Sequence, residues 1–155
     1  MKINCKVKII FLVITAIGLT ACGSYLKDRK SDKVDDGFSQ QIKPEKTTSP
    51  AVLALIKKAR VNAINGEIDK AMLRLERAVR IEPSNATVWH YMAKLFLQKE
   101  NYKQASGYAS KSISLSGNNK PLVIDNWRVI AHARYRLGDT KGAQAAQDTL
   151  NTLQQ

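Results

Sequence analysis

The residues that could carry out chemistry are few in this sequence and lie far apart. His90 and His132 are the only histidines, and they are separated by 42 residues without a cysteine between them. The sequence has no glycine-rich phosphate loop, no Gly-x-Ser-x-Gly nucleophile elbow and no His-Glu-x-x-His zinc motif. Two isolated histidines make a poor metal site, because zinc in proteins takes three or four ligands. The sequence therefore predicts no enzyme, no metal and no cofactor.

Cysteine chemistry is confined to the start of the chain, where Cys5 and Cys22 both lie. Three lysines precede an uninterrupted apolar run at 9–19, and no acidic residue lies among them. At about 1.5 Å per residue this run would span roughly 16 Å as a helix, half of a hydrocarbon core of ~30 Å. The pattern is typical of the apolar region of a signal peptide, with an uncleaved membrane anchor as the alternative.

Cys22 follows the apolar run in a specific order of residues. Leu19, Thr20 and Ala21 precede it, and this order resembles the lipobox of bacterial lipoprotein signal peptides. The resemblance implies that 1–21 is a signal peptide cleaved after Ala21, and that Cys22 is acylated on its sulfur and its new amino group. Several acyl chains on one residue give stable anchoring. The alternative is an ordinary secretory peptide with an accidental cysteine.

The next segment, 22–50, is predicted to be the acylated cysteine and a flexible linker. Eleven of the 28 residues at 23–50 are charged, with mixed sign, and the large apolar residues follow no sustained period. A random coil of this length reaches roughly 30 Å. Ser49 and Pro50 should end the linker, because serine caps helices and proline suits the first helical turn. In lipoproteins of this kind Gly23, rather than Asp, after the cysteine favours the periplasmic side of the outer membrane over the inner membrane.

The remainder of the chain repeats itself. Landmark residues recur at spacings of 34 and then 38 residues: Ala59, Ala93 and Ala131; Ala71, Ala105 and Ala143; and, at the second spacing, Trp89 and Trp127. A period near 34 is the signature of the tetratricopeptide repeat. The four extra residues of the second spacing are expected in the turn-rich stretch 116–121.

Residue patterns strengthen this assignment. Trp89-x-x-Met92-Ala93-x-x-Phe96 resembles the Trp-x2-Leu-Gly-x2-Tyr pattern of a tetratricopeptide first helix, and Trp127-x-x-Ile130-Ala131 follows the same pattern. The chain thus resembles tetratricopeptide-repeat outer-membrane lipoproteins of Gram-negative bacteria. The resemblance implies an all-α fold at 51–155, a short α-solenoid of three repeats (about 52–85, 86–119 and 124–155). Its six antiparallel helices would form a right-handed superhelix, with both tryptophans packed between repeats.

In similar proteins the first helix of each repeat lines a concave binding groove. Carried over to this sequence, the groove positions are Ile56, Arg60, His90, Lys94, Arg128 and His132, with Arg136 one turn further. Members of each pair are four residues apart and share a helical face, and Lys94 and Arg128 are expected to face solvent in one concavity. The groove would be cationic and would lack the asparagines of a carboxylate clamp. The alternative is a merely solvated face, since 51–155 holds 16 Lys or Arg against 8 Asp or Glu.

The function implied by the resemblance is a lipid-anchored periplasmic scaffold or adaptor that binds another envelope protein or peptide. Pilotins of pilus secretins and adaptors of peptidoglycan enzymes are such proteins. If the cationic groove is the binding site, the partner is expected to be acidic. The alternative is a cationic binder of peptidoglycan or lipopolysaccharide, because the whole chain carries a net charge of +12. Polymer binding should weaken steeply with salt, whereas a packed peptide interface should not. No nucleic-acid partner is expected.

Overall fold

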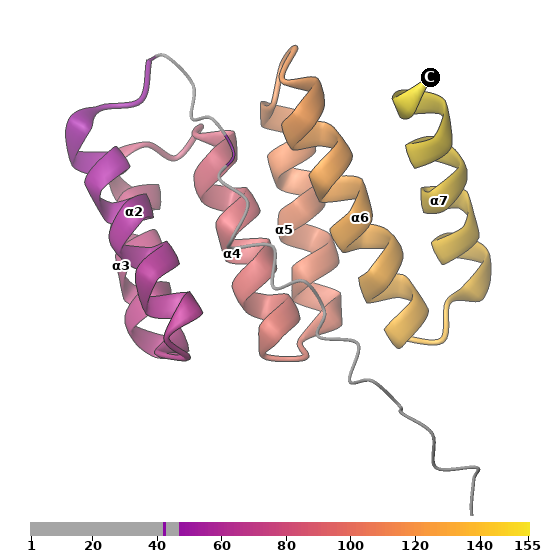
Figure 1. The fold of residues 1–155 in the computed structure, drawn as a ribbon, viewed down its shortest axis with the longest axis horizontal. Coiled ribbons are helices and arrows are strands. Elements are labelled where there is room, and N and C mark those ends of the chain that lie inside the picture. Colours follow the sequence, from indigo (N-terminus) through magenta and orange to yellow (C-terminus); the bar gives the residue numbers. More distant parts are fainter. Residues whose placement is uncertain (1–41, 43–46) are drawn as a thin grey trace, which may run out of the picture. The chain divides into compact units, whose positions relative to one another are not determined.

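A computed structural model describes residue 42 and residues 47–155 of the chain (Figure 1). The predicted signal peptide at 1–21, the lipidation site Cys22 and nearly all of the predicted linker lie outside the described residues. Among the described residues, no helix is both long enough and apolar enough to cross a membrane.

The described residues form six α-helices and no strand, which confirms the predicted all-α fold. The helices are α2 (Pro50–Ile64), α3 (Ile68–Ile81), α4 (Ala86–Gln98), α5 (Tyr102–Leu115), α6 (Lys120–Arg136) and α7 (Thr140–Gln154). They pair as three hairpins, α2 with α3, α4 with α5 and α6 with α7, which Figure 1 shows side by side. We call α2, α4 and α6 the inner helices, since they also contact one another in sequence order, and α3, α5 and α7 the outer helices.

Local sequence explains where these helices begin and turn. Ser49 caps α2 with Pro50 in its first turn, and side chains of Asn85, Asn101, Asn119 and Asp139 cap the next four helices that start after α3. Each hairpin turn has one residue with a positive φ angle: Gly66 (77°), Glu100 (57°) and Gly138 (79°). Glycine adopts this left-handed conformation without a steric penalty, so Glu100 is the strained member of the three.

The four-residue insertion is not where the turn-rich sequence placed it, and this prediction is corrected. The loops before α4 and α6 have the same length, 82–85 and 116–119, whereas α6 has 17 residues and α4 has 13. The insertion is therefore one additional turn of α6. Four residues are close to the 3.6 of one helical turn, so the added residues leave the faces of the helix nearly in register.

Small residues let the helices approach, and aromatic residues fill the remaining space. Ala59, Ala71, Ala93 and Ala105 have no exposed surface. Tyr108 lies between Phe96 and Trp89, with ring centroids 5.0 and 5.5 Å away and nearly parallel planes. The Trp89 indole N–H donates to the carbonyl of Pro83 at 2.7 Å. Trp89 is therefore a packing residue, as expected from its place in the repeat.

Candidate functional site

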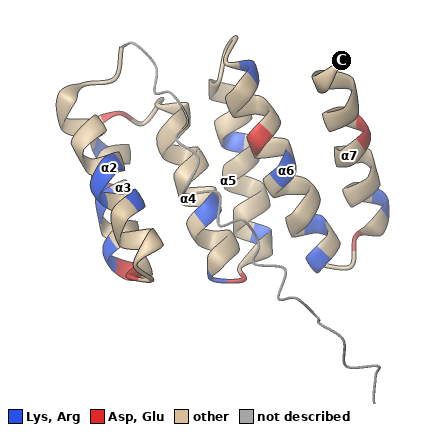
Figure 2. Ribbon diagram, viewed as in Figure 1, with Lys and Arg blue, Asp and Glu red and all other residues tan. Residues whose placement is uncertain are grey.

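The inner helices carry a larger net positive charge than the outer helices, because they have fewer acidic residues. They hold eight Lys or Arg and a single acidic residue, Asp125. The outer helices hold seven Lys or Arg and three acidic residues. Figure 2 shows basic residues on α2, α4 and α6 and one acidic residue on α6. The charge of the chain is thus arranged by helix and is not spread evenly.

Asp125 lies at the centre of these charges and joins α6 to α4. Its Oδ2 atom is 2.8 Å from Nζ of Lys94 and 3.1 Å from Nε2 of His90, and its Oδ1 is 3.5 Å from the Arg128 guanidinium. The side chains of His90, Lys94 and Asp125 are 0%, 6% and 16% exposed, whereas Arg128 is 53% exposed. The group is a largely buried charge cluster with one solvent-facing arginine.

Helical spacing explains how the two helices bring these residues together. His90 and Lys94 are four residues apart on α4, and Asp125 and Arg128 are three apart on α6, so each pair projects from one face. The cluster lies where these two inner helices contact each other.

Asn126 ties the cluster to a third helix. Its amide nitrogen donates to the carbonyl of Leu122 at 2.9 Å and to Oγ of Ser112 at 2.7 Å, and Ser112 in turn donates to the carbonyl of Ala86. Because both of these partners accept from Asn126, its Oδ1 must face Nδ1 of His90, 2.9 Å away. The Nδ1–H of His90 therefore donates to Asn126, and Nε2, which faces Asp125, can donate to that carboxylate only when the ring carries a second proton.

Burial and neighbouring charge oppose each other at both titratable groups. Burial and the charge of Lys94 lower the pKa of His90, and together they outweigh Asp125 and Asn126, which act to raise it. Burial alone would raise the pKa of Asp125, but His90 and Lys94 hold that pKa well below its ordinary range. Burial thus favours the neutral form of the His90 ring, whereas the neighbours of Asp125 favour its ionised carboxylate.

These shifts predict a loss of stability in acid in two stages. The pKa of His90 in the folded chain is lower than its ordinary 6.5. Below pH 6.5 the unfolded chain is therefore protonated at His90 more fully than the folded chain, and the free energy of unfolding falls. The pKa of Asp125 is lower than its ordinary 3.8, so its contribution is present above that pH and is lost as the pH falls further. The midpoint of urea unfolding, followed by circular dichroism, should fall first below about pH 6.5 and again below about pH 4.

Substitutions can separate the two stages. Asp125→Asn should flatten the second stage, since it removes the group that titrates there. His132 contributes to the first stage in the same direction, because burial and Arg136 lower its pKa, so His132→Gln should remove only part of that stage. A midpoint that stays constant or rises between pH 7 and pH 5 would contradict the assignment.

Two further sites flank the cluster on the inner helices. Between α2 and α4, the Arg60 guanidinium lies 5.8 Å from the centre of the Tyr91 ring. At the α6–α7 hairpin, the Arg136 guanidinium lies 4.7 Å from the centre of the Tyr102 ring, and His132 lies 6.5 Å from the same ring. Cation–π contacts of this kind hold each arginine over an aromatic face.

The structure thus brings together only part of the predicted groove set. His90, Lys94 and Arg128 meet at Asp125, Arg60 lies apart at Tyr91, and His132 and Arg136 share Tyr102. The expectation that Lys94 faces solvent is wrong, because its side chain is buried against the Asp125 carboxylate. Arg128 is exposed as expected, and Arg136 is exposed as well.

Sequence reasoning missed Asp125 and Asn126. A signal for Asn126 was present, because this polar residue lies on the apolar stripe of α6, four residues after Leu122 and four before Ile130. Buried polar side chains almost always have hydrogen-bond partners, so a polar neighbour on another helix was to be expected. In the described part of the chain no three His, Cys, Asp or Glu side chains are grouped as metal ligands would be.

Comparison with known proteins identifies the class of this domain. The sequence matches no protein-family model and no curated protein. Among solved structures, the N-terminal domain of stress-induced protein-1 (STI-1) from C. elegans is similar with a TM-score of 0.59. That match has 12% identity and covers 72% of this chain and 100% of the other, so it shows the fold alone. The fold of the described residues is thus that of a tetratricopeptide-like helical repeat domain.

A second solved structure is similar in sequence as well as in fold. The globular C-terminal domain of P. aeruginosa LpoP matches with a TM-score of 0.64 and 30% identity, over 66% of this chain and 97% of that domain. The repeat domain is thus similar to the LpoP domain along almost the whole length of that domain.

Proposed function

We propose that this chain is an adaptor of the bacterial envelope whose inner helices bind a segment of another protein. The observation that carries the proposal is the net positive charge of those helices, which hold eight Lys or Arg with one acidic residue, against seven and three on the outer helices. Helical repeat domains present extended concave surfaces to their ligands. A surface of this charge is complementary to a segment rich in Asp and Glu.

The individual cations would have different roles in such an interface. Arg128 and Arg136 are exposed on α6, eight residues apart, and are positioned to meet carboxylates of a partner. Lys94 is buried beside Asp125, which suits it to holding α4 against α6. Binding would then use the arginines for contact and the buried cluster for the relative placement of the helices.

We further propose that the adaptor is anchored by acyl chains on Cys22, on the periplasmic side of the outer membrane. The order Leu19, Thr20, Ala21, Cys22 after an apolar run supports this anchoring. The similarity of the repeat domain to the C-terminal domain of LpoP supports the first part of the proposal, that the chain is an envelope adaptor. We propose no catalytic activity for the chain.

The experiment neutralises the two exposed arginines in the full-length chain. Arg128→Gln together with Arg136→Gln should reduce recovery of crosslinked envelope partners about tenfold, because two lost attractions of about 0.7 kcal/mol each amount to a factor of ten. Glutamine is preferred to glutamate because a carboxylate at position 128 would lie beside Asp125, which is 3.5 Å from the arginine. Recovery is measured by quantitative mass spectrometry after affinity purification.

A matched control separates the inner helices from overall charge. Arg74→Gln with Arg77→Gln removes the same charge from exposed positions on the outer helix α3 and should leave recovery nearly unchanged. Equal losses in both double variants, together with steep weakening by salt, would favour binding to an anionic polymer. No loss in either would show that the arginines of α6 make no contact with a partner.

A further inference from the structure

A hollow of about 370 Å³ lies between the inner helices α2 and α4. Its walls are Leu53, Ile56, Lys57 and Arg60 on α2, and Thr87 and Tyr91 on α4. Ligand pockets in proteins begin at about 300 Å³, so this hollow is large enough for one side chain and its adjoining backbone. It lies at the Arg60 end of the surface that we propose for partner binding.

The lining combines apolar walls, cations and a hydrogen-bonding group. Leu53 and Ile56 provide aliphatic surface, and Lys57 and Arg60 provide positive charge. Thr87 is fully buried, and its Oγ1 has no hydrogen-bond partner among the described residues. A buried hydroxyl without a partner costs roughly 1–3 kcal/mol, and the cost is removed when a ligand brings a polar atom to it. The lining therefore suits a peptide that has an aliphatic side chain, a backbone amide and an acidic neighbour.

The chain itself supplies the remaining wall. Ile42, eight residues before the first residue of α2, is half-buried and lines the hollow. Burial raises the pKa of the Tyr91 phenol, and both the charge of Arg60 and a backbone hydrogen bond from Ile42 act in the opposite direction. The branched aliphatic side chain and backbone of Ile42 thus lie where the chemistry of the lining would place a peptide ligand.

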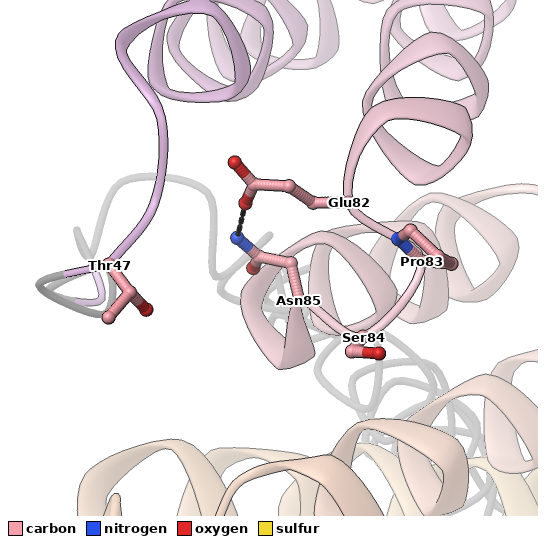
Figure 3. A pocket seen from close by; sticks show the side chains of 5 residues that line it. All are labelled: Thr47, Glu82, Pro83, Ser84 and Asn85. Atoms are coloured by element: carbon pink, nitrogen blue, oxygen red, sulfur yellow. Dashed lines mark hydrogen bonds between the residues drawn. The ribbon is translucent and has the colours of Figure 1, made fainter.

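Thr48 and Ser49, directly before α2, are held against the loop between α3 and α4. The Thr48 hydroxyl accepts from the Asn85 amide at 3.0 Å, and the backbone N–H of Ser49 donates to Glu82 at 2.8 Å. Figure 3 shows Glu82 and Asn85 hydrogen-bonded to each other, with Thr47 across from them. These contacts fix the start of α2 against the loop that precedes α4.

The covering of α4 is consistent with an occupied surface. Thr87, Tyr91 and Lys94 lie on one face of α4, at spacings of four and three residues, and all three are buried. In α2 and α6, by contrast, each helix keeps exposed residues along its length. α4 is the central inner helix and contacts α2, α3, α5 and α6, and Ile42 lines the hollow beside Thr87 and Tyr91 on this buried face.

We propose that this hollow is a peptide-binding pocket for a branched aliphatic residue with an acidic neighbour, and that Ile42 occupies part of it as an internal competitor. The inference rests on the proposed function, since it names the chemistry of the partner segment that the inner helices bind. A partner must then displace Ile42, and its apparent affinity is reduced by the fraction of molecules in which the pocket is occupied.

The test uses the full-length chain and a fluorescein-labelled peptide with the chain's own sequence 34–49, which includes Ile42. Ile42→Ser in the protein should strengthen binding of this peptide about tenfold relative to the unsubstituted chain, as expected if Ile42 occupies the pocket about nine-tenths of the time. Fluorescence anisotropy measures the affinity. Ile81→Ser, at an exposed isoleucine of the outer helix α3, is the matched control and should have no effect.

Two further measurements locate the bound peptide. In the Ile42→Ser background, Thr87→Val should weaken binding several-fold, because valine has nearly the shape of threonine and lacks the hydroxyl. A peptide in which its own isoleucine is replaced by serine should bind at least tenfold more weakly. Circular dichroism checks that each protein variant keeps its helical content.

Equal affinity of the unsubstituted, Ile42→Ser and Ile81→Ser chains for the peptide would overturn the proposal. So would undiminished binding of the serine-containing peptide. These outcomes are distinct from failure of the adaptor function, which is judged by partner recovery with Arg128→Gln and Arg136→Gln. If the peptide binds as expected but partner recovery is unchanged, the proposal that α6 contacts the partner is contradicted. The proposal of the peptide-binding pocket is then still supported.

Discussion

Replacing Asp125 by alanine should lower the melting temperature of the repeat domain by roughly 12–24 °C. The substitution removes the carboxylate 2.8 Å from the Lys94 ammonium, whose side chain is 6% exposed. Breaking a buried ion pair by removing one partner costs about 3–5 kcal/mol, and the 16% exposure of Asp125 reduces this to about 3 kcal/mol. For a domain of this size each kcal/mol corresponds to roughly 4–8 °C.

An exposed ion pair of the same kind provides the control. Asp69 on α3 lies 3.0 Å from Nζ of Lys99, and these side chains are 91% and 46% exposed. Asp69→Ala should therefore change the melting temperature by no more than about 2 °C. Thermal unfolding by circular dichroism compares the two variants, and equal small effects would mean that solvent reaches the Asp125 cluster.

A double variant tests the reason for the loss. Adding Lys94→Met to Asp125→Ala removes the charge that the first substitution leaves without its carboxylate, and methionine retains most of the side-chain volume. The double variant should be more stable than Asp125→Ala alone, because replacing both members of a buried pair by apolar groups is often neutral. A double variant that is less stable than the single one would show that Lys94 stabilises the fold through other contacts.

The repeat spacing was sufficient to predict the helices, for a physical reason. Ala59, Ala71, Ala93 and Ala105 are at positions where two helices touch, and all four are fully buried. Only a small side chain fits at such a contact, so alanine recurs with the period of the hairpins. The capping residues were also visible, because an asparagine or aspartate at a helix start accepts a backbone N–H that the helix leaves unpaired.

The position of the insertion could not be predicted from the spacing. A change from 34 to 38 residues gives the amount of added chain but not its location. The residues Ser116, Gly117, Asn118 and Asn119 all favour turns, yet they form a loop no longer than 82–85. The added residues instead extend α6, where Pro121 is accommodated because it lies in the first turn.

The charge cluster was beyond sequence reasoning for a related reason. Periodicity predicts that His90 and Lys94 share a face of α4, but not which residue of α6 lies opposite. That choice depends on the axial placement of α6 against α4, which the added turn makes uncertain by about 6 Å. Only the folded structure shows that Asp125 and Asn126 reach both ring nitrogens of His90.

The contact between α4 and α5 is the site of the second large expected effect. Ala105 on α5 is fully buried and belongs to one apolar cluster with Ala93 on α4 and Ala133 on α6. Ala105→Trp inserts an indole into this contact and should cost about 3 kcal/mol or more, the upper end of the range for overpacked cores. The upper end applies because α4 is also packed against α2, α3 and α6 and has little room to shift.

The measurement is the free energy of unfolding in urea, with Ala145→Trp as the control. Ala145 lies on α7 and is exposed, so a tryptophan there should change the free energy of unfolding by less than about 0.5 kcal/mol. A loss of about 3 kcal/mol is a large share of the 5–15 kcal/mol typical of a domain, so Ala105→Trp should be partly unfolded at 37 °C. If both variants unfold at the same urea concentration as the original chain, Ala105 is not at a helix contact and the helices of the middle repeat are packed through a different face.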